Sequence, residues 1–263
     1  MVPTMNSIVN SDTYPIHRND DPRSQQLIAS AQSQLATVGT CHFPQFLSPA
    51  GLSHCRKEAI ALEFQAHPSN NQYTPYYSEP DDSYPAGHPR NSTVRFAVRY
   101  VSRKLISNDS PLKILFQGDD LLTFLRGLLP DEPIYRYSDP RGSLNYTVMG
   151  ANDQLGWHFD ACELVASILL RPADDGGDFE YIPSVRSAED ENFSAVSSIL
   201  GGNDEQRIAV DFQPGDMVLF RGRHSLHRVT PIQGKTTRLM ALMSFDNVEQ
   251  ALERDVPDDL LPP

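Results

Sequence analysis

The sequence predicts a mainly β protein with N-terminal helices (α+β), whose β core is a sandwich or barrel of short strands. Three observations predict this class. From residue 134 onward, short segments with apolar or alternating character follow one another. Turn sequences such as "ADDGGD" and "QPGD" separate these segments, and stretches with helical spacing come earlier. The expected strands lie in "IYRY", "SLNYTVMG", "ELVASILLRP", "GDFEYIP", "QRIAVDF", "DMVLFRG", "SLHRVTP" and "RLMALMSFD".

Helices are expected mainly before the strands. In the segment 48–67, apolar residues recur at helical spacing, Ser48 suits the N-cap, and Pro49 suits the first helical position. Further helices are expected over 24–39, 118–130 and, as an insert among the strands, 188–202.

We expect one domain over residues 1–263, built from three parts. Residues 1–24 are polar and are expected to form a flexible N-terminal segment. Residues 25–130 are expected to supply a helical support with a lid loop, and residues 131–248 the β core. The loop is expected at 68–90, which is rich in Pro, Asn, Ser and Asp and carries four tyrosines. Both a lid and a plain surface excursion fit this composition.

Composition and charge exclude several classes of function. The net charge is −12, so no basic surface is expected for nucleic acid or for anionic membranes. The chain has no apolar segment long enough to span a bilayer, and its first residues do not resemble a signal peptide. Three scattered cysteines predict no disulfide framework and favour a cytoplasmic location. We therefore expect a small-molecule partner, while the sequence leaves the oligomeric state open.

The segment "GWHFDACE" contains the first candidate metal ligands, His158 and Asp160. Residues two apart on a strand point to the same face, so both side chains should meet at one place. A third ligand is expected from "GRHSLHRVTP", where His227 is favoured over His224. Two histidines and one carboxylate with open positions form the facial triad of non-haem Fe(II) oxygenases.

Arg238 supplies the second half of the pattern. It begins the predicted strand "RLMALMSFD", and we expect "TPIQGKTT" to join this strand to that of His227 and bring Arg238 near the metal. A buried guanidinium binds a carboxylate through two hydrogen bonds, which suits a dicarboxylate co-substrate such as 2-oxoglutarate.

This ordered set of motifs resembles the Fe(II)/2-oxoglutarate-dependent dioxygenase superfamily, whose core is a double-stranded β-helix (jelly roll, cupin-like). The segments "LGWHFD", "GGDFEYIP", "PGDMVLFRGRHSLHRVTP" and "TTRLMALMSFD" carry the resemblance over roughly residues 134–248. The chain is most similar to small hydroxylases and radical halogenases of free amino acids. Those halogenases have Gly or Ala where this chain has Asp160, so Asp160 implies hydroxylation or another oxidation, with no halide on the iron.

The resemblance implies Fe(II), 2-oxoglutarate and O2 as cofactors and co-substrates, with ascorbate helpful in vitro, and His158, Asp160 and His227 as catalytic metal ligands. It also implies that oxidation of a small molecule releases succinate and CO2. Amino acids or their derivatives are the first substrate candidates, and natural-product intermediates the second. The co-substrate residues that it suggests are Arg238, Asn145, Tyr146, Thr237 and Ser244. The suggested substrate residues are Arg141, His224 and Glu163.

A different function also fits the three ligands. A cupin-like metal-binding or metal-hydrolytic protein could hold Zn²⁺ with the same residues and use no 2-oxoglutarate. Arg238 and the "HRVTP" context favour the oxygenase.

Overall fold

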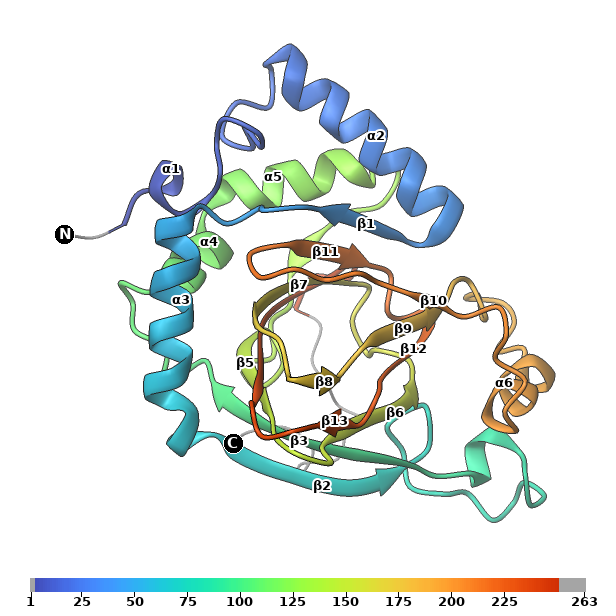
Figure 1. The fold of residues 1–263 in the computed structure, drawn as a ribbon. Coiled ribbons are helices and arrows are strands. Elements are labelled where there is room, and N and C mark those ends of the chain that lie inside the picture. Colours follow the sequence, from blue (N-terminus) through green and yellow to red (C-terminus); the bar gives the residue numbers. More distant parts are fainter. Residues whose placement is uncertain (1–2, 251–263) are drawn as a thin grey trace.

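A single antiparallel sheet curls round a central cavity in the computed structural model, which describes residues 3–250 (Figure 1). Its strands, in spatial order, are β1 (Thr40–Phe43), β11 (Met217–Phe220), β7 (Leu164–Arg171), β14 (Arg238–Asp246), β5 (Leu144–Met149), β3 (Val94–Ser102), β6 (Gln154–His158), β12 (Leu226–Val229), β9 (Phe179–Ile182) and β10 (Ile208–Ala209). Beside this path, β2 (His67–Tyr73) pairs with β3, β4 (Tyr135–Arg136) pairs with β14, and β8 (Asp175–Gly176) pairs with β13 (Ile232–Gln233).

Strand β3 forms the corner between two layers, because it pairs with β5 on one side and with β6 on the other. The open side of the curl is joined by the Thr40 and Tyr181 hydroxyls, which lie 2.8 Å apart on β1 and β9. This is the predicted double-stranded β-helix, and it places β6 and β12 opposite β7 and β14 across the cavity.

Alternation along the strands decides which side chains reach the cavity. On β5, Asn145, Thr147 and Met149 line the cavity, whereas Tyr146 and Val148 point to the outer face and join the core under the helices. Strand β7 is buried along almost its whole length because both of its faces are covered. A third apolar cluster, which includes Trp157, lies beneath α6.

Helices cover the outer face of one layer (Figure 1). They are α1 (Met5–Ile8), α2 (Pro22–Val38), α3 (Pro49–Leu62), α4 (Pro111–Gln117) and α5 (Asp119–Leu128), while α6 (Phe193–Leu200) lies on the opposite side. The predicted cap is present, since the Ser48 side chain accepts a hydrogen bond from the Gly51 N–H. Between residues 3 and 250, no helix is long and apolar enough to cross a membrane.

The N-terminal segment differs from its prediction in the part that the structure describes, residues 3–24. Ile8, Val9 and Ile16 are buried in the main core, and Val9 forms a β-bridge with Leu47. The Tyr14 hydroxyl donates a hydrogen bond to the Pro44 carbonyl at 2.6 Å. A few apolar residues spaced among polar ones therefore hold this segment against the core.

Three strands lie before residue 131, where only helices and a loop were expected. Residues 67–73 form the edge strand β2, with Ser69 and Tyr73 buried and most other positions exposed. An edge strand needs few apolar residues, since one side of its ladder and much of its surface face solvent. The expected loop of 68–90 is therefore shorter, and it begins after Tyr73.

Candidate metal centre and co-substrate cavity

Two histidines from neighbouring strands meet in the cavity. His158 at the end of β6 and His227 on β12 are paired directly across the ladder, and their ring centroids lie 4.1 Å apart. Both side chains are buried. The ligand that we expected from "GRHSLHRVTP" therefore comes from the adjacent hydrogen-bonded strand.

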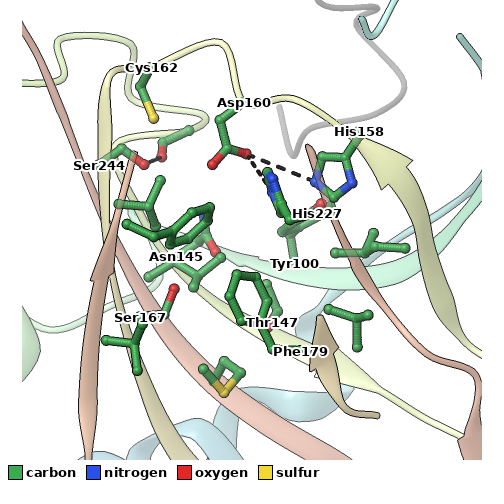
Figure 2. Close-up of a pocket in the computed structure, with 18 of the residues that line it drawn as sticks. Tyr100, Asn145, Thr147, His158, Asp160, Cys162, Ser167, Phe179, His227 and Ser244 are labelled. Atoms are coloured by element: carbon green, nitrogen blue, oxygen red, sulfur yellow. Dashed lines mark hydrogen bonds and ion pairs between the residues drawn. The ribbon is translucent and has the colours of Figure 1, made fainter. Parts of the chain in front are cut away.

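Asp160 completes a group of three possible metal ligands, whose ligand atoms all lie within 4.8 Å of one another. Its Oδ1 atom lies 3.9 Å from His158 Nε2 and 3.5 Å from His227 Nε2 (Figure 2). The Asp160 N–H donates to the Gly222 carbonyl at 3.0 Å, which fixes the turn after β6. Because β6 ends at His158, Asp160 lies in the turn after the strand, and this turn, not the expected strand alternation, brings the two ligands together.

Backbone carbonyls orient both imidazoles. His158 Nδ1 lies 2.7 Å from the Gly156 carbonyl oxygen, and His227 Nδ1 lies 2.9 Å from that of Ser225. A carbonyl only accepts, so each Nδ1 must carry the proton and each Nε2 lone pair is free for a metal.

The protonation states also suit a cation. Burial, followed by repulsion from His227, lowers the pKa of His158 to about 3, so the ring is neutral at neutral pH. Burial alone would raise the pKa of Asp160, but its interactions with His227 and His158 and the charge of Arg186 hold it below its usual value. Asp160 Oδ2 is buried and has no hydrogen-bond partner within residues 3–250. A buried carboxylate oxygen without a donor is costly unless a cation meets it, so the site fits a metal ion.

Arg238 lines the same cavity from the start of β14. Only 5% of the residue is exposed, and no hydrogen bond or ion pair connects its guanidinium to any part of the chain that the structure describes. Burial lowers its pKa to about 10, so the group stays charged at neutral pH. Gly177 makes room for it, because a Cβ atom there would lie 2.8 Å from Arg238 Cδ. A buried cation of this kind calls for an anion.

The strand pairing that we expected for Arg238 is wrong. Strand β14 is hydrogen-bonded between β5 and β7 and has no pairing with β12. Arg238 therefore faces the metal ligands from the other layer of the curled sheet, and not from a neighbouring strand.

The other predicted co-substrate residues divide into two groups. Asn145 and Ser244 line the cavity (Figure 2). Tyr146 lies on the outer face of β5 and donates from its hydroxyl to Glu58 Oε2 at 2.6 Å. Thr237 is hydrogen-bonded to Arg171 through its hydroxyl and its carbonyl and does not line the cavity. Tyr146 is thus turned away from any co-substrate by the alternation of β5, and Thr237, which precedes β14, is held away by its hydrogen bonds to Arg171.

The three predicted substrate residues do not line the cavity either. Arg141 pairs with Asp139 at 2.9 Å in the turn before β5. His224 and Glu163 face each other, with His224 Nε2 3.4 Å from Glu163 Oε2. Arg141 is thus paired with Asp139, and Glu163 also accepts a hydrogen bond from Arg221 Nε at 2.7 Å, both outside the cavity.

The position of Tyr146 leads to a stability prediction. Tyr146→Phe removes a hydrogen bond from a fully buried hydroxyl position to the half-buried carboxylate of Glu58, so we expect a loss of about 1–3 kcal/mol in the free energy of unfolding. Tyr135→Phe is the matched control, because the Tyr135 hydroxyl has no hydrogen bond to another described residue. Urea unfolding of both variants measures the difference. An equal effect of the two substitutions, or a large rise in the KM for a co-substrate in Tyr146→Phe alone, would contradict this placement.

Several cavity residues had no signal in the sequence. Tyr77, Tyr100, Thr147 and Ser167 line the cavity, but each is common in ordinary strands and loops. Tyr77 comes from the tyrosine-rich loop, and its ring centroid lies 5.3 Å from that of His158.

The loop is attached to the metal-ligand segment itself. Phe159 donates its N–H to the Pro75 carbonyl at 2.9 Å, and the Tyr76 ring stacks on Phe159 at 5.6 Å between centroids. The loop thus forms part of the cavity wall.

Gly222 is a further residue that the sequence did not reveal. A Cβ atom at this position would lie 2.6 Å from Asp160 Cγ, closer than non-bonded atoms approach. We expect Gly222→Ala to displace Asp160 and to weaken Fe(II) binding by roughly 10- to 100-fold. Gly150→Ala is the control, since a Cβ there meets only ordinary contacts of 3.7 Å or more. Metal titration followed by calorimetry compares them, and equal affinities would show that Asp160 does not depend on Gly222.

The family model described as Halogenase D (HalD) matches residues 88–259. No curated protein sequence matches the chain. Solved structures give the fold. The non-heme α-ketoglutarate-dependent epimerase SnoN from nogalamycin biosynthesis is 15% identical with a TM-score of 0.56, and the match covers 84% of this chain and 82% of that one.

Two other solved structures agree with this fold. A 2OG-Fe(II) oxygenase family oxidoreductase from Burkholderia pseudomallei is 17% identical, with a TM-score of 0.52 and coverage of 84% and 91%. A prolyl hydroxylase from Trichoplax adhaerens is 16% identical, with a TM-score of 0.51 and coverage of 86% and 91%. The fold is therefore that of the 2-oxoglutarate- and iron-dependent oxygenases, and the chain belongs to the Halogenase D family.

Proposed function

We propose that the protein is an Fe(II)- and 2-oxoglutarate-dependent oxygenase that hydroxylates an unactivated C–H bond of a small molecule. The observation that carries this proposal is the buried, unpaired guanidinium of Arg238 in the same cavity as the His158, Asp160 and His227 group. A metal-hydrolytic protein would need the three ligands but has no use for a free cation inside the barrel.

The side chains would divide the work as follows. His158, Asp160 and His227 would hold Fe(II), and Arg238 would bind the distal carboxylate of 2-oxoglutarate through two hydrogen bonds. The Asn145 amide lines the cavity, and so does the Ser244 hydroxyl, which donates to the Gly142 carbonyl at 2.9 Å and can still accept a hydrogen bond. When bound, the iron and 2-oxoglutarate supply oxidation by O2, with release of succinate and CO2. The protein's part is to orient the reactants and to exclude water.

Asp160 supports hydroxylation in a family whose model is named for halogenases. By the resemblance given above, halogenases leave this ligand position to a halide. Here a carboxylate occupies it, and the Gly222 backbone packs against that carboxylate. Further oxidations such as desaturation or cyclisation would use the same residues.

We also propose that the partner is a small molecule, either an amino-acid derivative or a natural-product intermediate, and that the protein acts in the cytoplasm. None of the three cysteines forms a disulfide and all are buried, which fits a reducing compartment.

The test is 2-oxoglutarate turnover by protein reconstituted with Fe(II) and ascorbate, followed by measurement of succinate. We expect the protein to convert 2-oxoglutarate to succinate. A chelator should abolish this turnover, a true substrate should increase it, and the His227→Ala variant should lack it. Metal binding without 2-oxoglutarate consumption in the presence of any substrate would instead support the cupin-like metal-binding or hydrolytic function.

A further inference from the structure

We propose that the part of the substrate that enters the metal cavity carries no formal charge: an apolar C–H-bearing group with neutral hydrogen-bonding groups, and not a free zwitterionic amino acid. This inference rests on the proposed function and specifies its substrate class. Within it, derivatised amino acids and neutral natural-product intermediates remain substrates, and free amino acids do not.

Charged groups in the cavity are few. Among its described lining residues, the only Asp, Glu, Lys or Arg side chains are those of Asp160 and Arg238. Both already have a function, as metal ligand and as carboxylate anchor. Most of the remaining lining is apolar, with Leu155, Val165, Phe179, Phe212, Val218, Phe220, Val229, Met240 and Leu242 among it.

The charges also cancel once the co-substrate is considered. The two positive charges of Fe(II) and the one of Arg238 balance Asp160 and a doubly anionic 2-oxoglutarate. Both histidines would bind as neutral imidazoles. A further ammonium or carboxylate inside the barrel would therefore be buried without a partner, which is strongly unfavourable.

Cations next to the lining residues cannot supply that partner. Arg223 donates to the carbonyl of the lining residue Ala161 and pairs with Asp246 at 2.6 Å. Arg186, whose charge acts on Asp160, pairs with Glu191 at 3.1 Å. Recruiting Arg223 for a substrate carboxylate would leave Asp246 without a cation, and recruiting Arg186 would break its ion pair with Glu191, which would keep only the longer 3.7 Å contact with Arg90.

Neutral hydrogen-bonding groups, by contrast, are available. The Ser167 and Thr147 hydroxyls line the cavity, and neither has a hydrogen bond to another residue between 3 and 250. Asn145 Oδ1 is buried and also lacks a partner in this part of the chain. Figure 2 shows Asn145 and Ser167 together on the side of the cavity away from His158. These groups suit a carbonyl, hydroxyl or amide of a neutral substrate.

Matched probes test this proposal without turnover. L-Leucine and L-phenylalanine are each compared with their N-acetyl amides, which keep the side chain but remove both charges. The protein is loaded with Mn(II) and 2-oxoglutarate, whose binding is first confirmed by calorimetry. Because Mn(II) broadens the NMR signals of nearby protons, ligand-observed spectra report only probes that bind beside the metal. A Zn(II)-loaded sample controls for binding elsewhere.

We expect the neutral amides to bind beside the metal at least ~10-fold more tightly than the zwitterions. Equal or tighter binding of the zwitterions, or failure of every neutral probe to bind, overturns the proposal. If Mn(II) and 2-oxoglutarate bind and the probe order is reversed, the substrate class alone is wrong. If 2-oxoglutarate does not bind at all, the proposed function fails with it.

A second experiment changes the charge of the cavity. Asn145→Asp, which is isosteric, and Ser167→Asp each add a carboxylate to the cavity. Both variants should therefore bind the cationic probe L-leucinamide more tightly, relative to the neutral amides, than the unmodified protein does. Ser53→Asp on the exposed face of α3 is the matched control and should leave the order of probes unchanged. No shift in the Asn145→Asp and Ser167→Asp proteins, with the fold verified by near-UV circular dichroism, also overturns the proposal.

Discussion

Asp160→Ala should lower Fe(II) affinity by roughly 100-fold or more and leave almost no 2-oxoglutarate turnover. The carboxylate is the only anionic member of the three-residue group, and its Oδ2 atom has no other partner in the chain between residues 3 and 250. Removing it leaves two neutral imidazoles, which hold a ferrous ion weakly. Calorimetric titration with Fe(II) under nitrogen measures the affinity, and succinate release measures the turnover.

Asp109→Ala is the control for this variant, because Asp109 is an exposed carboxylate far along the chain from the metal ligands. It should bind Fe(II) as the unmodified protein does. Retained Fe(II) affinity in Asp160→Ala would mean that the metal is held elsewhere and that the three-residue group is structural.

Arg238→Met should raise the KM for 2-oxoglutarate by about 100-fold, since two charge-assisted hydrogen bonds to a carboxylate are lost. Methionine keeps much of the apolar stem, and burial, which lowers the pKa of Arg238 to about 10 against the opposing charge of Asp178, disfavours the cation inside the cavity. The variant is therefore expected to be at least as stable as the unmodified protein, because the buried cation is removed. Steady-state kinetics and urea unfolding together separate this outcome from a simple folding defect.

Arg95→Met provides the comparison on β3, where the half-buried side chain lies outside the cavity lining and is hydrogen-bonded to Asn70 and Asn152. It should leave the KM unchanged. An unaltered KM in Arg238→Met, or marked destabilisation of that variant, would contradict the role given to the free guanidinium.

The sequence was sufficient for the parts of the fold that depend on local pattern. Spacing and turn residues predict the β-rich C-terminal half and the helix with the Ser48 cap. They also predict where the segments that carry the metal-binding motif begin and end. The three candidate ligands were found because His158 and Asp160 are close in sequence and His227 stands in a distinctive context.

The errors arose where long-range packing decides the outcome. Strand β2 is polar because it lies at an edge, so its sequence resembles a loop. Tyr146 was predicted to face the co-substrate, but one step along β5 turns it to the outer face and toward Glu58. Gly222 makes room for Asp160 from a distant segment, and a glycine gives no sign of such a contact in a single sequence.

The most direct test of the central claim is an anaerobic titration of the Fe(II)-loaded protein with 2-oxoglutarate, followed by the visible absorption of the iron–keto acid chelate. We predict that the absorption saturates at one equivalent in the unmodified protein, is absent in His227→Ala, and needs far more 2-oxoglutarate in Arg238→Met. A protein that binds iron but develops no such absorption, or one in which Arg238→Met titrates like the unmodified chain, would contradict the account.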